Sequence, residues 1–264
     1  MNRSRYRGAI GPALGLRESP VTWAIIAVNI LLWIGLTITG GSENTINLYH
    51  WGAKYGGGPD SLRSGILDGE WWRLIVPVFL HAGLFHLVAN TFGLVAFGGT
   101  VERTFGSVSF AAIYLLSGVL GNVASLWWGP NLGVGASGAV FGMIGAFGAY
   151  LLLNRQHLGQ IGRQSLTTVG FLIVINVLFG LVMTDVVDNA AHVGGLLGGT
   201  LIGLALAPQE SLAVPSGPIH MGPVIKRVKA RPGVAQIAVV VAVACALAAL
   251  IAYWATQFHG PAWP

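Results

Sequence analysis

Serine, histidine and asparagine side chains occur at three separated points of a chain that is otherwise strongly apolar. Ser137 lies in the sequence Gly-Ala-Ser-Gly, and His192 is followed by a run of glycines. A serine hydroxyl beside a neutral imidazole can act as a nucleophile with its general base. His86 and Asn90 are four residues apart, so on a helix they share one face. Each of these residues also has a structural interpretation, because polar side chains in membrane helices often serve only to join helices.

The composition indicates what kind of scaffold must position these residues. Of the 264 residues, 14 are Lys or Arg and 9 are Asp or Glu, so that 9% are charged and 54% are hydrophobic. A soluble domain carries about 25% charged residues, and the mean hydropathy here is +0.70. These values exclude a disordered chain and indicate a membrane protein. The single cysteine, Cys245, excludes an internal disulfide framework and a cysteine-cluster metal site.

Intervals without charged residues mark the candidate membrane spans, because an ionisable side chain at the bilayer centre is costly. Six long intervals occur, and five of them have room for one span of about 20 residues. The interval 104–154 is long enough for two spans and contains the turn signal Trp-Gly-Pro-Asn at 128–131. The sequence therefore predicts an all-α membrane protein with seven spans, at 21–39, 76–98, 108–127, 136–153, 166–184, 190–207 and 234–256.

Lys and Arg in the connecting loops set the expected orientation. With the N-terminus in the cytoplasm, 11 of the 14 basic residues lie inside, and only Lys54, Arg63 and Arg73 lie outside. This asymmetry accounts for the net charge of +5 without a nucleic-acid partner. The expected regions are a basic cytoplasmic tail (1–18), a six-span core (19–207), a Pro-rich basic cytoplasmic linker (208–233), the seventh span (234–256) and a short tail (257–264).

Glycines on the fourth and sixth spans predict that these two helices pack with their backbones in close approach. They are Gly138, Gly142, Gly145 and Gly148 on one span and Gly194, Gly195, Gly198, Gly199 and Gly203 on the other. This spacing is typical of small-residue helix interfaces in membranes. Ser137 and His192 open the two spans at the same outer level, so we expect the hydroxyl about 2.6–3.2 Å from the imidazole. The alternative is glycine packing with an incidental serine and histidine.

Five short motifs follow one another along the predicted spans. They are Trp72-Arg73, His81–Asn90, Glu102–Ser107, Gly135–Gly138 and Ala191–Gly195. In this order, and over residues 20–207, the chain resembles the rhomboid family of intramembrane serine proteases. The resemblance implies a six-helix membrane bundle, here with an extra C-terminal helix. It also implies cleavage of transmembrane segments near the outer membrane face, through an acyl-enzyme.

The resemblance further implies roles for single residues. Ser137 is the expected nucleophile and His192 its general base, with no required carboxylate. His86 and Asn90, with the Ser137 backbone N–H, are the expected oxyanion hole. Phe141 is expected to pack on the histidine ring. The glycines expected to pack helices around this dyad are Gly135, Gly138, Gly195 and Gly199. No metal and no cofactor is expected.

Several neighbouring residues have competing interpretations. Asp185 or Asp188 could orient His192, but a simpler role for Asp188 is to cap the sixth span. His81 is expected at the membrane interface, pointing away from His86, because five residues correspond to about 140° on a helix. Trp72 and Arg73 are expected to anchor the outer loop at the lipid headgroups.

Three rival functions stay open at this point. A catalytically inactive relative would bind and escort membrane proteins, although the serine and histidine are both present. A transporter or channel would need polar residues along a whole path, whereas here they stop at the outer side. Haem or metal binding by histidines would lack carboxylates at membrane depth. The expected partners are thus transmembrane protein substrates and the lipid bilayer. The short tails and compact loops favour a bacterial plasma membrane.

Overall fold

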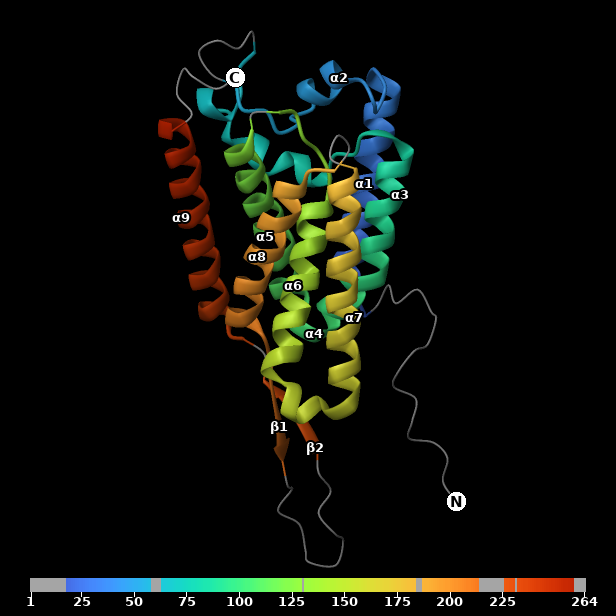
Figure 1. The fold of residues 1–264 in the computed structure, drawn as a ribbon, viewed down its shortest axis with the longest axis vertical. Helices are drawn as coiled ribbons and strands as arrows, with labels where there is room; N and C mark the ends of the chain where they lie inside the picture. Colours follow the sequence, from blue (N-terminus) through green and yellow to red (C-terminus); the bar gives the residue numbers. More distant parts are fainter. Residues whose placement is uncertain are drawn as a thin grey trace, which may run out of the picture.

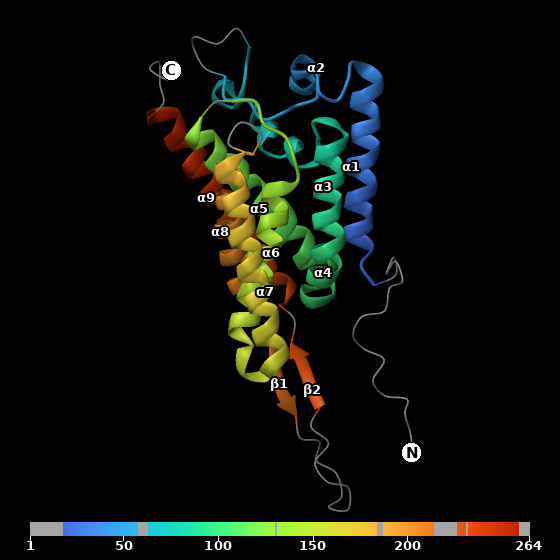
Figure 2. The ribbon, with the colours of Figure 1, turned by 45° about the vertical axis from the view of Figure 1, so that its right-hand side comes forward.

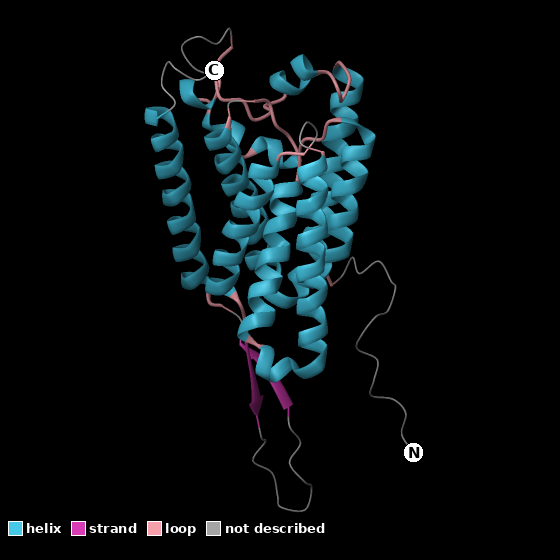
Figure 3. Ribbon diagram, in the orientation of Figure 1, coloured by secondary structure: helices cyan, strands magenta, loops and turns pink. Residues whose placement is uncertain are grey.

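The computed structural model describes residues 18–57, 63–129, 131–183, 187–213, 226–230 and 232–258. Long helices stand side by side in one bundle (Figure 1). One end of the bundle carries the short helix α2 (Thr45–His50), and the opposite end carries two short strands (Figure 3). We call these the α2 end and the hairpin end. By the loop charges, the α2 end is the expected outer side.

The bundle consists of apolar helices of the length that a membrane requires. Five described segments are long and apolar enough to cross a bilayer, and two further apolar helices are shorter. These observations confirm a helical membrane bundle, whereas the number of seven spans stays a prediction. The helices are α1 (Pro20–Thr39), α3 (Gly83–Gly93), α4 (Gly99–Phe105), α5 (Ser107–Trp128), α6 (Ser137–Leu153), α7 (Arg155–Val182), α8 (Asn189–Leu206) and α9 (Val234–Phe258).

The second span begins later than the charge-free interval indicated. We expected it at 76–98, but helix α3, the π-helical turn Leu94–Gly98 and α4 form one segment over Gly83–Phe105. The apolar residues before it form the 3₁₀ helices η2 (Trp71–Leu74) and η3 (Val76–Phe79). Pro77 lies in the first turn of η3, and Gly83 has φ +82°, a backbone conformation that suits glycine. Hydropathy alone does not distinguish such turns from a helix.

Glu102 is a charged residue near the end of this segment, and it is buried inside the bundle. Its carboxylate accepts hydrogen bonds from the Val21 N–H (3.0 Å), the Thr22 N–H (2.8 Å) and the Thr22 hydroxyl (2.7 Å). It also accepts one from the Ser107 hydroxyl (2.7 Å). Glu102 is only 1% exposed. One side chain thereby satisfies free N–H groups at the start of α1 and joins α4 to the starts of α1 and α5.

We expect Glu102→Gln to lower the free energy of unfolding by about 1.5–3 kcal/mol, the usual contribution of a hydrogen bond to a charged group. The glutamine amide nitrogen would face donors that now meet a carboxylate oxygen. Unfolding in detergent, followed by circular dichroism, measures the loss. Thr22→Val removes a single hydroxyl donor and should cost less. Equal stability of Glu102→Gln and the wild type would contradict this assignment.

One more predicted boundary needs correction, and the predicted linker contains two strands. The fifth span was expected at 166–184, but α7 starts at Arg155 and contains a break at Gly159 (φ 58°, ψ −135°). The first part of α7 contains Arg155 and Arg163, so it falls outside the charge-free interval. The predicted linker 208–233 contains the antiparallel strands β1 (Gln209–Ala213) and β2 (Lys226–Ala230). The linker's middle residues, 214–225, lie outside the described residues, as do the tail residues 1–17 and 259–264.

Helix α6 is the central helix, with α5 and α8 packed against it (Figure 2). Glycines bring α6 and α8 into backbone contact, as the sequence predicted. A Cβ on Gly195 would overlap the backbone of Gly138, and one on Gly199 would overlap the backbone of Gly142. This close approach fixes the position of the start of α8 relative to the start of α6.

Candidate active site

Ser137 is the first residue of α6, at the α2 end of the bundle, and it is partly exposed. The segment before it is held in place, because the Gly135 N–H donates to the Pro77 carbonyl at 2.9 Å. The first intrahelical bond of α6 runs from the Val140 N–H to the Ala136 carbonyl at 2.9 Å. The Ser137 N–H therefore has no acceptor within its own helix and is available at the positive end of the helix dipole.

His192 lies in the first turn of α8, where its backbone N–H donates to the Asp188 carbonyl at 3.1 Å. The Phe141 ring stacks on the imidazole, with ring centroids 4.3 Å apart and planes inclined by 18°. Phe141 lies one turn after Ser137 on α6. The ring contact that the sequence predicted is thus present, and it restricts how the imidazole can turn.

Ser137 and His192 stand on two sides of one tight helix contact. A Cβ on Gly138 would lie 3.3 Å from the Ala191 carbonyl oxygen. The residue after the serine therefore packs against the residue before the histidine. Among the residues that the structure describes, no hydrogen bond joins the hydroxyl to the imidazole, so the expected 2.6–3.2 Å separation stays a prediction. Catalytic hydrogen bonds often tighten only when a substrate is bound.

His86 faces the same space as the serine. A Cβ on Gly135 would lie 2.7 Å from His86 Nε2 and 3.8 Å from Ser137 Oγ, and Gly135 has φ +131°. The other ring nitrogen, Nδ1, accepts from the Ala82 N–H at 3.4 Å, which assigns the proton to Nε2. Asn90 is 5% exposed, and one of its amide hydrogens is donated to the His86 carbonyl at 3.0 Å. The second amide hydrogen is the one that could serve a ligand.

His81 does not point away from His86. It lies before the start of α3, so the angle calculated for a continuous helix does not apply. Its fully buried ring meets the His86 ring edge-on, with centroids 5.3 Å apart. Within the described part of the chain, no group of three or more His, Cys, Asp or Glu residues could hold a metal ion.

Asp188 caps α8, as the simpler interpretation of this residue stated. Its Oδ1 accepts from the Ala191 N–H at 2.9 Å. Its other oxygen accepts from the Ser125 hydroxyl, which in turn accepts from the Lys54 ammonium. Sequence reasoning missed Lys54, since it resembles any solvated lysine of an outer loop. Asp185 lies outside the described residues.

The expectation for Arg73 was wrong. Arg73 is 5% exposed and lies inside the outer loop rather than at lipid headgroups. Its guanidinium donates to the carbonyls of Tyr49 (2.8 Å) and Ala53 (3.0 Å), pairs with Glu70, and lies 4.1 Å from the centre of the Tyr49 ring. Arg73 thus holds the loop in its fold. Trp72 is 42% exposed, so its expected place at the membrane interface stays a prediction.

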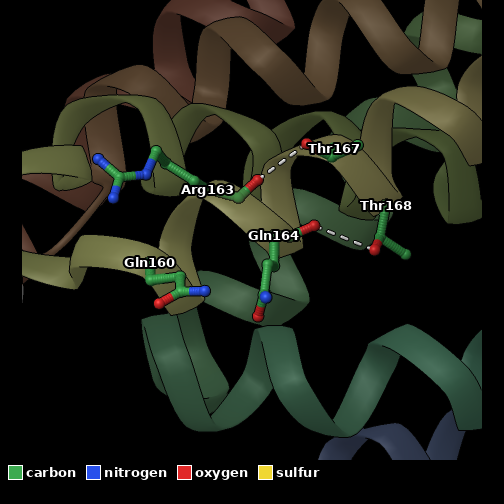
Figure 4. A pocket seen from close by; sticks show the side chains of 5 residues that line it. All are labelled: Gln160, Arg163, Gln164, Thr167 and Thr168. Atoms are coloured by element: carbon green, nitrogen blue, oxygen red, sulfur yellow. Dashed lines mark hydrogen bonds between the residues drawn. The ribbon is translucent and has the colours of Figure 1, made fainter.

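The described part of the structure contains two hollows, and only the smaller one is lined by His192. A small cavity of about 110 Å³ lies beside His192, between α6, α7 and α8, and its lining includes Phe141, Asn176 and Leu181. A larger, polar hollow of about 550 Å³ lies along the first half of α7 (Figure 4). There the Thr167 and Thr168 hydroxyls donate to carbonyls of their own helix. Neither Ser137 nor His192 lines the larger hollow, whereas His192, without Ser137, lines the smaller one.

Known proteins are similar to this chain in sequence. The family model of the rhomboid domain matches residues 68–209. The rhomboid protease GluP of Bacillus subtilis is 42% identical over 186 residues, which cover 70% of this chain and 34% of GluP. YdcA, a second rhomboid-named protein of that organism, is 31% identical over 193 residues, 71% of this chain and 88% of YdcA. Rhomboid-like protease 1 of Toxoplasma gondii is 32% identical over 189 residues, 68% of this chain and 62% of that protein.

The chain therefore belongs to the rhomboid family of intramembrane serine endopeptidases. It is a multi-pass membrane protein. It spans about a third of the length of GluP and most of the length of YdcA.

Proposed function

We propose that this protein is an intramembrane serine endopeptidase that cuts transmembrane segments of membrane proteins near the outer membrane face. Ser137 is the nucleophile, and His192 is its general base. One observation carries the proposal. The first turns of α6 and α8 are in backbone contact beside the two residues, and the Phe141 ring stacks on the histidine ring.

The chemistry follows from these groups. His192 accepts the proton of the Ser137 hydroxyl as Oγ attacks the substrate carbonyl carbon. The carbonyl oxygen becomes negatively charged, and the Ser137 N–H, the His86 Nε2–H and the free amide hydrogen of Asn90 stabilise it. The imidazolium then gives its proton to the departing amine, which leaves an acyl-enzyme. Water, activated by the same imidazole, releases the acid and restores Ser137.

The depth of the site determines which substrates fit. Both helices begin at the expected outer side of the bundle, so water can reach the acyl-enzyme while the substrate stays in the bilayer. A transmembrane helix hides its carbonyls in its own hydrogen bonds. The substrate must therefore unwind locally, and we expect helix-weakening residues near the outer surface. We also expect small residues at the cut site, as the resemblance to the rhomboid family implies. The proposed location is a bacterial plasma membrane, which rests on the short tails and compact loops. The relatives come from Bacillus subtilis, Arabidopsis thaliana and Toxoplasma gondii and do not single out one kind of membrane.

The test uses the purified protein in liposomes with a single-span substrate that carries glycine and a small residue near its outer end. We expect one cut close to the outer membrane surface, mapped by mass spectrometry. A fluorophosphonate, which reacts with activated serines, should label Ser137 in the same preparation. Absence of both cleavage and labelling in well-folded protein would reject the protease and favour the inactive escort.

We expect Gly135→Ala to lower kcat about 10²–10³-fold, the usual cost of losing one oxyanion donor. The new methyl group would occupy the place of the His86 Nε2 edge, and Gly135 has a φ that alanine rarely adopts. Cleavage kinetics in liposomes measure the effect. Gly69→Ala is the control, because it also replaces a positive-φ glycine but its Cβ meets nothing within 4 Å. Equal kcat values for both variants would remove His86 from the oxyanion hole.

A further inference from the structure

Lys54 is buried in a place where an outer-loop lysine would normally be solvated. It is 1% exposed. Its ammonium donates to the Ser125 hydroxyl of α5, which donates to Asp188 Oδ2, and Lys54 Nζ lies 3.9 Å from that same oxygen. Burial lowers the pKa of the Lys54 ammonium, and the Asp188 carboxylate opposes this effect. We call these three residues the Lys54 network.

The backbone of Lys54 is paired with the segment that leads into Ser137. The Lys54 N–H donates to the Gly133 carbonyl at 2.8 Å, and the Gly133 N–H donates back to the Lys54 carbonyl at 2.9 Å. A Cβ on Gly133 would lie 3.1 Å from Lys54 Cε and 3.6 Å from Asp188 Oδ2. The lysine side chain therefore crosses directly over Gly133 on its way to the acid. Gly133 precedes Ser137 by four residues.

The other end of the network holds the start of α8. Asp188 Oδ1 accepts from the Ala191 N–H at 2.9 Å, and the Asp188 carbonyl accepts from the His192 N–H at 3.1 Å. Asp188 precedes His192 by four residues. Its side chain is 38% exposed, so without the lysine it could turn to solvent and release the cap. The Lys54 network thus links the segment before Ser137 to the first turn of α8, which carries His192.

We infer that Lys54 is a positioning residue for catalysis, which holds the Ser137 segment and the His192 turn in register through Ser125 and Asp188. This inference rests on the proposed protease function. Lys54 acts through its contacts with Ser125, Asp188 and Gly133 rather than on the reacting atoms. Its contribution is geometric, because a displacement of about 1 Å between reacting groups can cost about 10² in rate.

The test compares the wild type with Lys54→Met, Asp188→Asn and the double variant in liposomes. Methionine keeps the length of lysine without its charge, and asparagine keeps an oxygen for the helix cap. We expect Lys54→Met to lower kcat about 10²-fold with KM unchanged, which indicates loss of an interaction that matters in the transition state. Because the two residues act as one unit, the double variant should be no worse than the worse single variant. Ser125→Ala, which changes no charge, should lower kcat in the same sense.

Thr22→Val is the matched control, because it also removes a buried polar contact but lies at the hairpin end, bonded to Glu102. It should lose stability while its kcat stays at the wild-type value below the unfolding temperature. Amide hydrogen exchange gives a readout that needs no activity. Exchange should rise together at 131–137 and 188–192 in Lys54→Met, and at neither segment in Thr22→Val.

The outcomes separate the two proposals. Wild-type kcat in Lys54→Met or Ser125→Ala, with Ser137-dependent cleavage by the parent protein, overturns the positioning role alone. Unchanged exchange at both segments in Lys54→Met overturns it too, whatever the activity. Absence of Ser137-dependent cleavage in the wild type rejects the proposed function, while the exchange experiment still decides whether the Lys54 network joins the two segments.

Discussion

Replacing Ser137 or His192 by alanine is expected to lower kcat by about 10⁶-fold, which puts cleavage below detection. Without the hydroxyl no acyl-enzyme forms, and without the imidazole the hydroxyl keeps its proton at neutral pH. The double variant should be no slower than either single variant, because the two side chains act as a unit. Single-turnover cleavage of a single-span substrate in liposomes measures all three.

Fluorophosphonate labelling separates loss of chemistry from loss of fold. The Ser137→Ala variant should take up no label, and the His192→Ala variant should take it up far more slowly than the wild type. Both side chains are partly exposed at the α2 end, so unfolding midpoints should stay near the wild-type value. Cleavage that survives in Ser137→Ala would show that another residue is the nucleophile.

The sequence was most informative for α6 and α8, where the glycines that pack the helices lie next to the candidate catalytic residues. Glycines spaced along α6 and α8 indicated the contact that the structure contains, since only small residues let two helix backbones meet. Helices α1, α5, α6 and α8 begin within about two residues of their predicted starts, because turn signals or charged residues bound these apolar intervals. The positions of Ser137 and His192 at the beginnings of two adjacent helices followed from both patterns together.

What the sequence did not reveal depends on segments that are distant in the chain. Lys54 is buried only because Ser125 on α5 and Asp188 at the start of α8 converge on it. No spacing rule joins residues from three separate segments. The contact of His81 with His86 was missed for a different reason. The predicted angle applies to a continuous helix, whereas the chain is extended just before Gly83. Arg73 was expected at the lipid headgroups because arginine is common there. In the structure its guanidinium instead donates to carbonyls inside the outer loop.

Gly199→Ala should destabilise the protein by about 3 kcal/mol, at the upper end of the usual cost of overpacking. A methyl group there would overlap the carbonyl oxygen, Cα and carbonyl carbon of Gly142, and a helix backbone cannot turn aside as a flexible side chain can. Relief therefore requires α8 to move away from α6. That movement carries His192 away from Ser137, so we also expect fluorophosphonate labelling to slow by about 10²-fold.

Gly170→Ala provides the matched comparison, because it makes the same substitution inside a helix where nothing lies within 4 Å of the new methyl group. Alanine has the higher helix propensity, so this variant should be as stable as the wild type or slightly more stable. Unfolding in detergent and the labelling rate of the folded protein measure both effects on both variants. Equal losses in the two variants would mean that glycine matters for helix flexibility in general. A loss confined to Gly199→Ala would show that the backbone contact between α6 and α8 itself holds the two candidate catalytic residues together.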